Sequence, residues 1–383
     1  MVYCERIMRA RDMNYCTKCV QPDTRPGIQL NASGVCPACE YTEDLKSVDW
    51  GSRDKELATI VEHSQKNNHS GYDCIVGVSG GKDSTRQALF VRDSLKLKPL
   101  LISCTYPPEQ QSDRGARNLS NLVGLGFDAI TISPDPQTWK KLVRKGFMEY
   151  GNWAKSTETA LYASLPRFSI AYHVPLIFLG ENPATQMGDL AMGSLDWNAN
   201  NMRNQNTIAG GADMYIDGET TKQHIIPYRY PPDVETQWAG TQLVFLGYFW
   251  RNFTKVDNAD FSISFGLDIR TDTPAGRGAL HPFEALDEDF VFVNQMIKYF
   301  KFGFGKVTDE VCELIRYGHM TREEGFKLVR KYDGKCSSEY IRRFCSYIDI
   351  TEEKFWKVAE SYRNKDIFEQ DSAGAWRLKT MAV

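Results

Sequence analysis

Short apolar runs alternate with segments of helical periodicity between residues 72 and 184. The runs are DCIVGV, PLLISCTY, DAITIS and VPLIFLG, at 73–78, 99–106, 128–133 and 174–180. Continuous apolar runs of this length are typical of parallel strands that are buried on both faces. Between them, apolar residues at helical spacing form two stripes: Ala88, Val91 and Leu95, then Ala116, Leu119, Leu122 and Val123. This alternation predicts an α/β fold, a doubly wound parallel sheet whose ligands bind at the carboxyl ends of its strands.

The pattern is different on either side of this core. Apolar spacing over RDKELATIVEHSQKN predicts a connector helix at 52–66, whereas the segment from 185 to 285 is rich in Asn, Gly, Pro, Trp and Tyr and shows few clear periods. We interpret that segment as an irregular insertion that binds substrate. Helical patterns return after it, with a capping box from Thr321 to Glu324 and a helix C-cap at Gly334. The predicted parts are an N-terminal extension with little structure, a cysteine-rich segment, the core, the insertion and a helical region, at 1–12, 13–50, 51–184, 185–285 and 286–383.

Length and charge narrow the function classes. A chain of 383 residues suggests two or three domains. The formal net charge of −3 does not favour binding of the whole chain to nucleic acid, although a local basic patch is compatible with it. We find no apolar run long enough to span a bilayer and no apolar core of a signal peptide near the start. These features predict a cytoplasmic protein without a membrane span.

Four of the ten cysteines form two CxxC pairs, Cys16 with Cys19 and Cys36 with Cys39. Each pair places two thiolates on one tight turn, and this spacing is typical of a tetrahedral zinc site. Since protein ligands would fill all four positions, we predict a structural zinc and not a catalytic one. The alternative, four reduced cysteines without a metal, would leave residues 13–41 with little to hold them together.

The sequence GVSGGKDS follows the first apolar run directly and has the composition of a phosphate-binding loop. Two glycines let backbone amides approach a phosphate, and two serines add hydroxyl donors. The lysine adds positive charge, and the aspartate can cap the following helix, expected to begin near Ser84, or hold magnesium. We therefore predict nucleotide contacts from Ser79, Gly80, Gly81, Lys82, Asp83 and Ser84. An ordinary glycine-rich turn between strand and helix is the alternative.

This loop resembles the PP-loop, SGGxDS, of the ATP pyrophosphatases, such as NAD synthetase, GMP synthetase and the synthetase domain of asparagine synthetase. The resemblance implies a sheet of the adenine-nucleotide α-hydrolase type and a bound ATP whose β,γ-pyrophosphate is the leaving group. Attack would then fall on the α-phosphorus, a substrate oxygen would be adenylated, and the products would include AMP and pyrophosphate. It also implies that the ends of the second and fourth strands reach the nucleotide, at Ser103, Cys104 and Thr105 and at Gly180, Glu181 and Asn182. Glu181 could be a magnesium ligand, a base or a satisfied loop carboxylate.

Further motifs narrow the family. A four-cysteine knuckle ahead of the PP-loop, LGENPATQMGDL, KYFKFGFGKVTDE and IRYGHMTREEGFKLVRKYDG together resemble the N-acetyl sugar amidotransferases of bacterial lipopolysaccharide and O-antigen synthesis, over about 13–360. The resemblance implies adenylation of the acetamido oxygen of a sugar, such as a UDP-linked diacetamido uronic acid, and its replacement by ammonia to give an acetamidino group. It also implies a phosphate contact from Lys301 and Lys306, which we include with Lys82, Asp83 and Glu181 among the candidate catalytic residues. A surface lysine pair at a helix end is the alternative.

Ammonia needs a source. A glutaminase requires a nucleophilic cysteine, but Cys4 does not follow the initiator and Cys74 lies in a predicted buried strand. The resemblance implies a separate glutaminase subunit and a barrel-type subunit that channels ammonia. Within the insertion, charged and aromatic side chains could bind the sugar, although each alone is more often structural; they are Arg203, Arg229, Arg270, Arg277, Trp197, Trp238 and Tyr228.

Two other functions compete with this one. A PP-loop enzyme that thiolates tRNA would need a thiol beside the adenylated base, and Cys104 is the only well-placed candidate. A non-catalytic zinc-ribbon scaffold with a vestigial nucleotide fold is the other, but such a protein has no physical need for both glycines and both hydroxyls of the loop. We therefore favour the sugar amidotransferase.

Overall fold

The computed structural model describes residues 13–186, 196–204, 207–251 and 253–380. Within them, a five-stranded parallel sheet has the order β3-β2-β1-β4-β5. Its strands are β1 (Cys74–Gly77), β2 (Pro99–Cys104), β3 (Asp128–Ile132), β4 (Leu176–Leu179) and β5 (Gln242–Phe245). The predicted α/β fold with a doubly wound parallel sheet is confirmed. The expectation for residues 1–12 lies outside the described residues, as do positions 187–190 of the LGENPATQMGDL segment.

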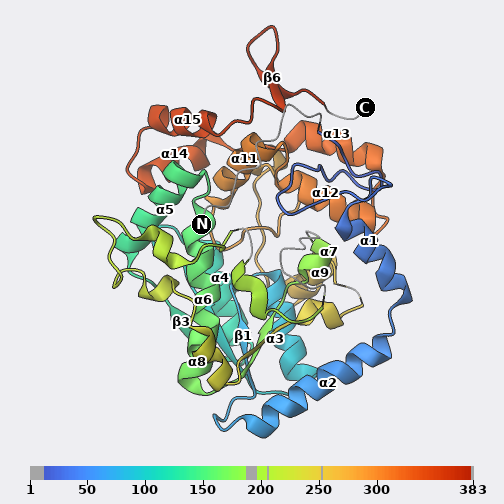
Figure 1. The fold of residues 1–383 in the computed structure, drawn as a ribbon, viewed down its shortest axis with the longest axis vertical. Coiled ribbons are helices and arrows are strands. Elements are labelled where there is room, and N and C mark those ends of the chain that lie inside the picture. Colours follow the sequence, from blue (N-terminus) through green and yellow to red (C-terminus); the bar gives the residue numbers. More distant parts are fainter. Residues whose placement is uncertain (1–12, 187–195, 205–206, 252, 381–383) are drawn as a thin grey trace.

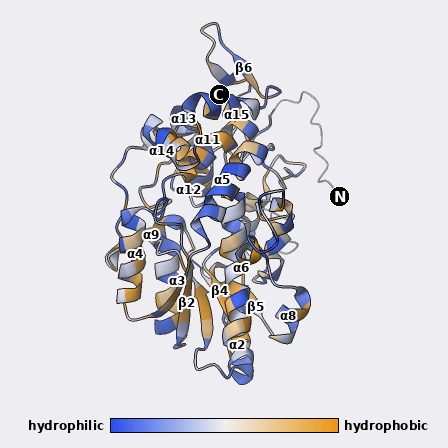
Figure 2. Ribbon diagram, turned by 90° about the vertical axis from the view of Figure 1, so that its left-hand side faces the viewer, coloured by the Kyte–Doolittle hydropathy of each residue, from blue (hydrophilic) through white to orange (hydrophobic). Residues whose placement is uncertain are grey.

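Helices cover both faces of this sheet. The helices before the C-terminal region are α1 (Pro37–Asp44), α2 (Trp50–Asn67), α3 (Lys82–Asp93), α4 (Asp113–Gly124), α5 (Pro136–Tyr150), α6 (Ala154–Tyr172), α7 (Pro183–Gln186), α8 (Asp233–Trp238), α9 (Lys255–Ser264) and α10 (Pro274–Arg277). Short 3-10 turns are η1 (Leu45–Ser47), η3 (Asn200–Asn204), η4 (Ala212–Tyr215), η5 (Ile226–Tyr228) and η6 (Leu246–Phe249). Because side chains alternate along a strand, Val76 packs with α2, α3 and α4, whereas Ile75 packs with α6. Figure 2 shows α4 and α6 on opposite sides of the hydrophobic strands.

Two details of the sheet differ from the sequence-based predictions. The prediction of burial on both faces is wrong for β3, whose residues are partly or fully exposed, because β3 is an edge strand with β2 as its neighbour. The segment read as an irregular insertion contributes β5, which pairs in parallel with β4. Its run Gln242–Phe245 is only four residues long, too short for a clear strand pattern.

The buried face of α4 also differs from its apolar stripe. The buried residues are Gly115, Asn118 and Leu122, whereas Ala116 and Val123 are exposed. This face touches the backbone of Gly80 and Asp287, which leaves space only for small or hydrogen-bonding side chains. Of the predicted stripe, Leu122 is therefore buried and Leu119 is partly buried, whereas Ala116 and Val123 lie outside the packed face.

The C-terminal region is helical, as predicted. It contains α11 (Val291–Phe302), α12 (Lys306–Arg316), α13 (Arg322–Tyr332), α14 (Ser338–Tyr347) and α15 (Glu352–Ser361), followed by the hairpin of β6 (Phe368–Gln370) and β7 (Trp376–Leu378). The capping box of Thr321 and Glu324 is confirmed, and Gly334 follows α13 with φ +72°. The helices α11–α15 form a layer above the sheet (Figure 1).

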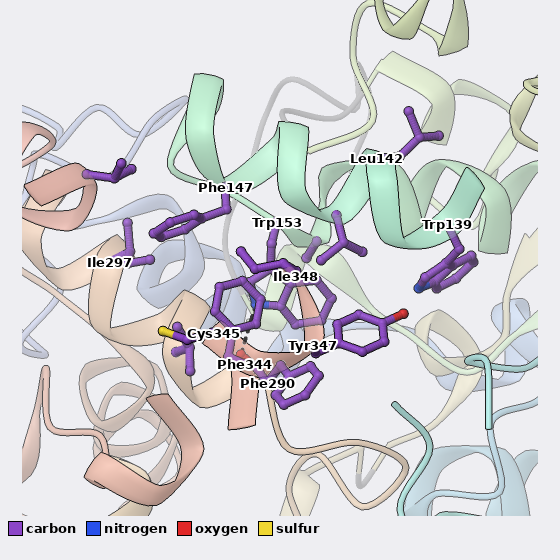
Figure 3. Packing of buried hydrophobic residues seen from close by; sticks show 14 of the residues in the cluster. Trp139, Leu142, Phe147, Trp153, Phe290, Ile297, Phe344, Cys345, Tyr347 and Ile348 are labelled. Carbon is purple, nitrogen blue, oxygen red and sulfur yellow. Dashed lines mark hydrogen bonds between the residues drawn. The ribbon is translucent and has the colours of Figure 1, made fainter. Parts of the chain in front are cut away.

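A large aromatic cluster joins this layer to the sheet domain (Figure 3). Phe147 of α5 stacks on Phe355 of α15 with ring centroids 5.1 Å apart. The indole of Trp153 donates a hydrogen bond to the carbonyl of Phe290 at 2.8 Å. Burying several aromatic side chains at one contact contributes several kcal/mol, so the two layers are held in a fixed relation. Among the described helices, none is both long enough and apolar enough to cross a membrane.

Candidate functional site

The predicted phosphate-binding loop lies at the carboxyl end of β1. This strand pairs with β2 on one side and β4 on the other, so the loop sits where the strand order reverses, the usual ligand position in such sheets. The helix after it, α3, begins at Lys82, two positions before the expected start at Ser84. The hydroxyl of Ser84 accepts a hydrogen bond from the backbone amide of Ser79 at 2.9 Å. Ser84 thus shapes the loop, and the positive end of α3 faces the site.

A cavity of about 100 Å³ lies over this loop. Its walls come from three separate parts of the chain: the loop, α4 and a segment just before α11. The lining residues are Ser79, Gly80, Gly81, Lys82, Asp83, Ser84, Gly115, Asn118, Phe283, Ala285, Leu286 and Asp287. All six residues of the SGGKDS motif therefore face one cavity, which we call the phosphate cavity.

Replacing Gly80 by alanine should deform the phosphate cavity. Gly80 has φ +83°, and a Cβ there would lie 2.7 Å from the backbone nitrogen of Leu119. Left-handed backbone strain and overpacking together should lower the free energy of unfolding by about 3 kcal/mol, measured by urea denaturation. Gly81→Ala is the matched control, since its Cβ would meet its nearest neighbour at 3.4 Å and should cost less than about 1 kcal/mol. Equal losses for the two variants would contradict this geometry.

Lys82 joins the loop to the C-terminal region through Glu284. Its ammonium lies 3.0 Å from Asp83 Oδ2 and 3.6 Å from Glu284 Oε1. Glu284 also pairs with Lys306 at 2.6 Å and with Lys255 at 3.9 Å. We call Glu284 with its three lysines the lysine hub. The side chains of all four are at most 18% exposed.

The lysine hub fixes the charge states at the loop. Burial by itself would raise the pKa of Glu284, but Lys306, Lys82 and Lys255 hold that pKa well below its usual range. Burial likewise opposes the charge of Lys82, yet Asp83 and Glu284 raise the pKa of its ammonium above the usual value. Lys82 and Lys306, both predicted as catalytic, are therefore brought together, and Lys82 remains a cation where a phosphate would bind.

Two residues that the sequence reading missed support Asp83. Asn258 donates to Asp83 Oδ1 at 2.6 Å, and the hydroxyl of Ser262 donates to the carbonyl of Lys82 at 2.6 Å. Both are 0% exposed and lie four positions apart on α9, in the segment read as an insertion. Polar residues at i and i+4 on one helix face were the available signal. This helix thus orients the carboxylate of Asp83.

Glu181 follows β4, and its carboxyl group is close enough to Asp83 to be affected by the charge of that residue. Burial, and next the negative charge of Asp83, raise the pKa of Glu181 to about 7, although a hydrogen bond from Tyr162 opposes the rise. Its Oε2 is buried without a hydrogen-bond partner among the described residues. A carboxylate oxygen left without a donor, near a second carboxylate, fits a hard cation such as Mg²⁺. When bound, Mg²⁺ would neutralise charge on a phosphate leaving group.

Glutamine in place of Glu181 tests this environment through pH. The pKa of Glu181 in the folded protein lies above its usual value of 4.5. Its contribution to the free energy of unfolding is therefore fully present below pH 4.5 and is lost as pH rises through about 7. Glu181→Gln carries no charge, so we expect it to exceed wild type in unfolding free energy by about 2–3 kcal/mol at pH 8 and by little at pH 4.5. Urea titrations without nucleotide or magnesium measure the difference.

The control for this comparison is Glu219→Gln, since the side chain of Glu219 is 80% exposed. It should change stability by less than about 0.5 kcal/mol at either pH. A difference between wild type and Glu181→Gln that does not vary with pH would contradict the raised pKa.

The other predicted nucleotide contacts lie at the same edge of the sheet. Ser103, Cys104 and Thr105 end β2 beside β1, and all three are at most 9% exposed. The hydroxyls of Thr105 and Ser133 lie 2.9 Å apart, and burial raises the pKa of Cys104 to about 12. After β4, Gly180 lies against the side chain of Gln87, and Asn182 donates to the carbonyl of Gly247 at 3.2 Å. The contacts of these five residues with the nucleotide remain a prediction.

Lys301 lies apart from Lys306. Its ammonium donates to the carbonyl of Tyr150 at 2.8 Å and lines a second cavity. α11 ends at Phe302 and α12 begins at Lys306, so the break between these helices directs the two lysines to different places. The structure therefore does not bring together all of the predicted catalytic residues.

Of the seven candidate sugar-binding side chains, all except the exposed Trp238 have other contacts or lie in the core. Arg270 donates to the carbonyl of Glu288 at 2.9 Å, and Arg277 donates to that of Leu280 at 2.7 Å. Arg203 and Arg229 pair with Asp233 and Asp213, Trp197 donates to Glu56, Tyr228 lies in the core, and Trp238 is 84% exposed. These positions agree with structural roles and leave sugar recognition a prediction.

The four cysteines of the CxxC pairs meet at one point. Their sulfur atoms all lie within 4.8 Å of one another and are buried. Cys16 Sγ is 3.9 Å from Cys39 Sγ, and Cys19 Sγ is 3.7 Å from Cys36 Sγ. Zinc–sulfur bonds of about 2.3 Å in a tetrahedron place sulfurs about 3.8 Å apart, so the geometry fits zinc.

The backbone supports this metal centre. The amides of Lys18 and Cys36 point at Cys16 Sγ, at 3.4 and 3.3 Å, as expected around thiolate ligands. The guanidinium of Arg322 binds the carbonyls of Cys16 and Cys19 at 3.2 and 3.0 Å. The zinc knuckle, residues 13–41, therefore docks on the N-terminus of α13.

Comparison with known proteins adds a family for the C-terminal region. Residues 284–382 match the model of a family described as LPS biosynthesis protein WbpG-like, C-terminal domain. This region is therefore similar to that domain, which supports the family resemblance drawn from the motifs. No curated protein matches the chain.

Solved structures show only distant likenesses. An NH3-dependent NAD synthetase from Campylobacter jejuni has 16% identity and a TM-score of 0.28, over 38% of this chain and 61% of that one. An NMN synthetase from Francisella tularensis has 13% identity and a TM-score of 0.28, over 59% of this chain and 99% of that one. We infer nothing about function from these two similarities. The fold is assigned from the strand order of the sheet.

Proposed function

Starting from the WbpG-like domain at residues 284–382, we propose that this chain is an ATP-dependent, AMP-forming amidotransferase of bacterial surface-polysaccharide synthesis. Its substrate in this proposal is an N-acetylated sugar, a UDP-linked 2,3-diacetamido uronic acid, and its product carries an acetamidino group. The observation that carries the proposal is the ion pair of Lys82 with Glu284, at 3.6 Å. It joins the phosphate loop to the first residue of the WbpG-like domain.

The chemistry explains why ATP is needed. An acetamido carbonyl is a poor electrophile, because its nitrogen donates electrons into it and its oxygen is a poor leaving group. In the proposed reaction the acetamido oxygen attacks the α-phosphorus of ATP, and the bond to the β,γ-pyrophosphate breaks. Ammonia then attacks the imidate carbon, and AMP leaves with the former acetamido oxygen. The overall products are the acetamidino sugar, AMP and pyrophosphate.

Each loop residue has a role in this scheme. The departing pyrophosphate would be held by the amides of Gly80 and Gly81, the hydroxyl of Ser79 and the ammonium of Lys82. All four residues line the phosphate cavity. Asp83 and Glu181 would hold magnesium. If Asp83 alone holds the metal, Glu181 with its pKa near 7 would instead be suited to take a proton from the attacking ammonia.

We propose that ammonia comes from partner proteins, a separate glutaminase and a barrel-type subunit that channels ammonia. High concentrations of ammonium salt should replace both partners in the test tube, because free ammonia is the proposed nucleophile.

Mass spectrometry tests the proposal directly. The chain, zinc-loaded, is incubated with ATP, magnesium, ammonium and a UDP-diacetamido uronic acid, and the sugar product should be about one mass unit lighter as C=O becomes C=NH. AMP and pyrophosphate should form in equal amounts with it. Unchanged sugar with every N-acetylated candidate, or release of ADP in place of AMP, would contradict the proposal.

The competing tRNA thiolation receives less support. Sulfur transfer needs a reactive thiolate, but burial raises the pKa of Cys104 to about 12, so this thiol stays protonated at neutral pH. Pyrophosphate release that requires tRNA and a sulfur donor, with none from sugar and ammonium, would restore that alternative.

A further inference from the structure

A second cavity, of about 530 Å³, lies where four parts of the chain meet. Its walls come from the zinc knuckle, from the end of α5 with the start of α6, from α11 with α12, and from Thr207 of the 185–285 segment. The lining residues used below are Arg25, Lys155, Glu158, Gln295, Lys298 and Lys301. We propose that this cavity is the subsite that holds the anionic part of the sugar acceptor. The inference rests on the proposed function, because it places the acceptor of that reaction.

The cavity wall carries more positive than negative charge. Three cationic side chains, those of Arg25, Lys155 and Lys301, face two carboxylates, Glu158 and Asp309. Lys298 is a fourth basic side chain in the wall, but burial and the charge of Arg25 hold its pKa well below the usual value. Asp309 is shared, since it pairs with both Arg25 and Lys298, the latter at 2.8 Å. Lys155 donates to the carbonyls of Thr207 and Ala209, at 3.0 Å each, and these neutral partners leave its charge in place. Such a wall favours an anion.

Aromatic rings hold these cations in position. Arg25 lies 4.3 Å and Lys298 4.8 Å from the ring centroid of Phe304. Lys301 lies 5.4 Å from the ring centroid of Phe302. Both rings line the cavity, so the positive groups are ordered before any ligand arrives.

One acceptor in the wall has no donor. Gln295 Oε1 is buried and has no hydrogen-bond partner among the described residues. Leaving such an oxygen unpaired costs about 1–3 kcal/mol, which a ligand hydroxyl or amide N–H would recover. The wall thus offers cations for an anion and an acceptor for a polar hydrogen, which together match a sugar acid or a sugar phosphate.

A single helix face connects this cavity with the phosphate loop. Lys155, Glu158 and Tyr162 are spaced three and four positions apart on α6, so they share one face. Lys155 and Glu158 line the cavity, and Tyr162 hydrogen-bonds to Glu181 at the end of β4. From Glu158 to Tyr162 the helix rises about 6 Å, roughly one sugar ring. A sugar anchored in the cavity can therefore direct its acetamido group toward Glu181.

The test is calorimetric titration of the full zinc-loaded chain with three probes: UDP, UDP-N-acetylglucosamine and UDP-N-acetylglucosaminuronic acid. Tighter binding of the uronic acid than of the other sugar assigns the cavity to the carboxylate, and equal binding of all three assigns it to the diphosphate. In either case Lys301→Met should weaken the tightest probe by about 10–100-fold, since a charge-assisted contact is lost. Lys327→Met is the matched control, because its side chain is 64% exposed, and it should change affinity less than twofold.

Gln295→Leu separates binding from folding. It removes the unpaired acceptor while keeping similar volume, so the melting temperature should stay the same or rise while probe affinity falls about three- to tenfold. Affinities for all probes that match wild type in both Lys301→Met and Gln295→Leu would overturn the subsite. If those variants still made the acetamidino product at the wild-type rate, the proposed function would stand without the subsite; if wild type made no product from any sugar, the function itself would fail.

Discussion

Asparagine in place of Asp83 is expected to lower the rate of AMP formation by roughly 10²–10³-fold at saturating ATP. Asp83 lies in the first turn of α3, faces the phosphate cavity and contacts Lys82 at 3.0 Å. The variant keeps the shape of the side chain and its acceptor for Asn258 but removes the charge that would hold magnesium. Rapid quench of radiolabelled ATP to AMP measures the loss, with ammonium and the sugar acceptor present.

The control for Asp83→Asn is Asp113→Asn, which removes a negative charge from the first turn of α4. Both changes disturb a helix N-terminus in the same way, but only the first touches the phosphate cavity, so Asp113→Asn should retain at least half of the wild-type rate. Rates of Asp83→Asn within fivefold of wild type would show that Asp83 has no part in the chemistry.

Removal of the metal is expected to unfold the zinc knuckle and to lower the stability of the whole chain. The two CxxC turns lie in one apolar cluster with α12 and α13, and a zinc bound by the four cysteines would tie them together, so its binding energy would be folding energy. We expect Cys36→Ser to lower the free energy of unfolding by at least about 3–5 kcal/mol, and chelation at elevated temperature to do the same. Zinc content by a chromophoric chelator and urea unfolding measure the two effects together.

The matched control for Cys36→Ser is Cys336→Ser, since Cys336 is partly exposed and lies outside the metal centre. It should retain one zinc per chain and lose less than about 1 kcal/mol. Full zinc content and unchanged stability in Cys36→Ser would mean that the four cysteines do not act as one site.

The zinc knuckle contacts α13 and forms part of the wall of the second cavity. Tyr15 packs edge-on against Phe326 of α13 with ring centroids 5.1 Å apart, and Arg25 lines the second cavity. Loss of the metal should therefore weaken sugar binding as well as stability, while the phosphate loop remains folded.

Features with a short, fixed spacing could be predicted from the sequence. The CxxC pairs, SGGKDS and the capping box of Thr321 are each set by residues within a few positions, so their geometry follows from local rules. The apolar runs predicted four of the five strands for the same reason.

Features that depend on distant parts of the chain could not be predicted in this way. Lys82 and Glu284 are about two hundred positions apart in the sequence. Nothing in the sequence around a lysine of this kind shows whether its side chain is buried or exposed. Asn258 and Ser262 look like solvated helix residues until α9 is seen against α3. The β5 strand was missed because its three apolar residues, Leu243, Val244 and Phe245, carry little periodicity, although the strand completes the sheet beside β4.

The lysine hub links residues before and after position 284, so the two parts of the chain depend on each other for stability. A polypeptide cut just before Glu284 would keep Lys82 and Lys255 in a buried pocket without their shared carboxylate, and a separate C-terminal fragment would keep Glu284 and Lys306 without the other two cations. Breaking a buried ion pair by removing one partner costs about 3–5 kcal/mol, a large share of the stability of one domain. We therefore expect that residue 284, where the family match begins, is not a border between cooperative folding units, and that heating melts both sides of it in one calorimetric transition.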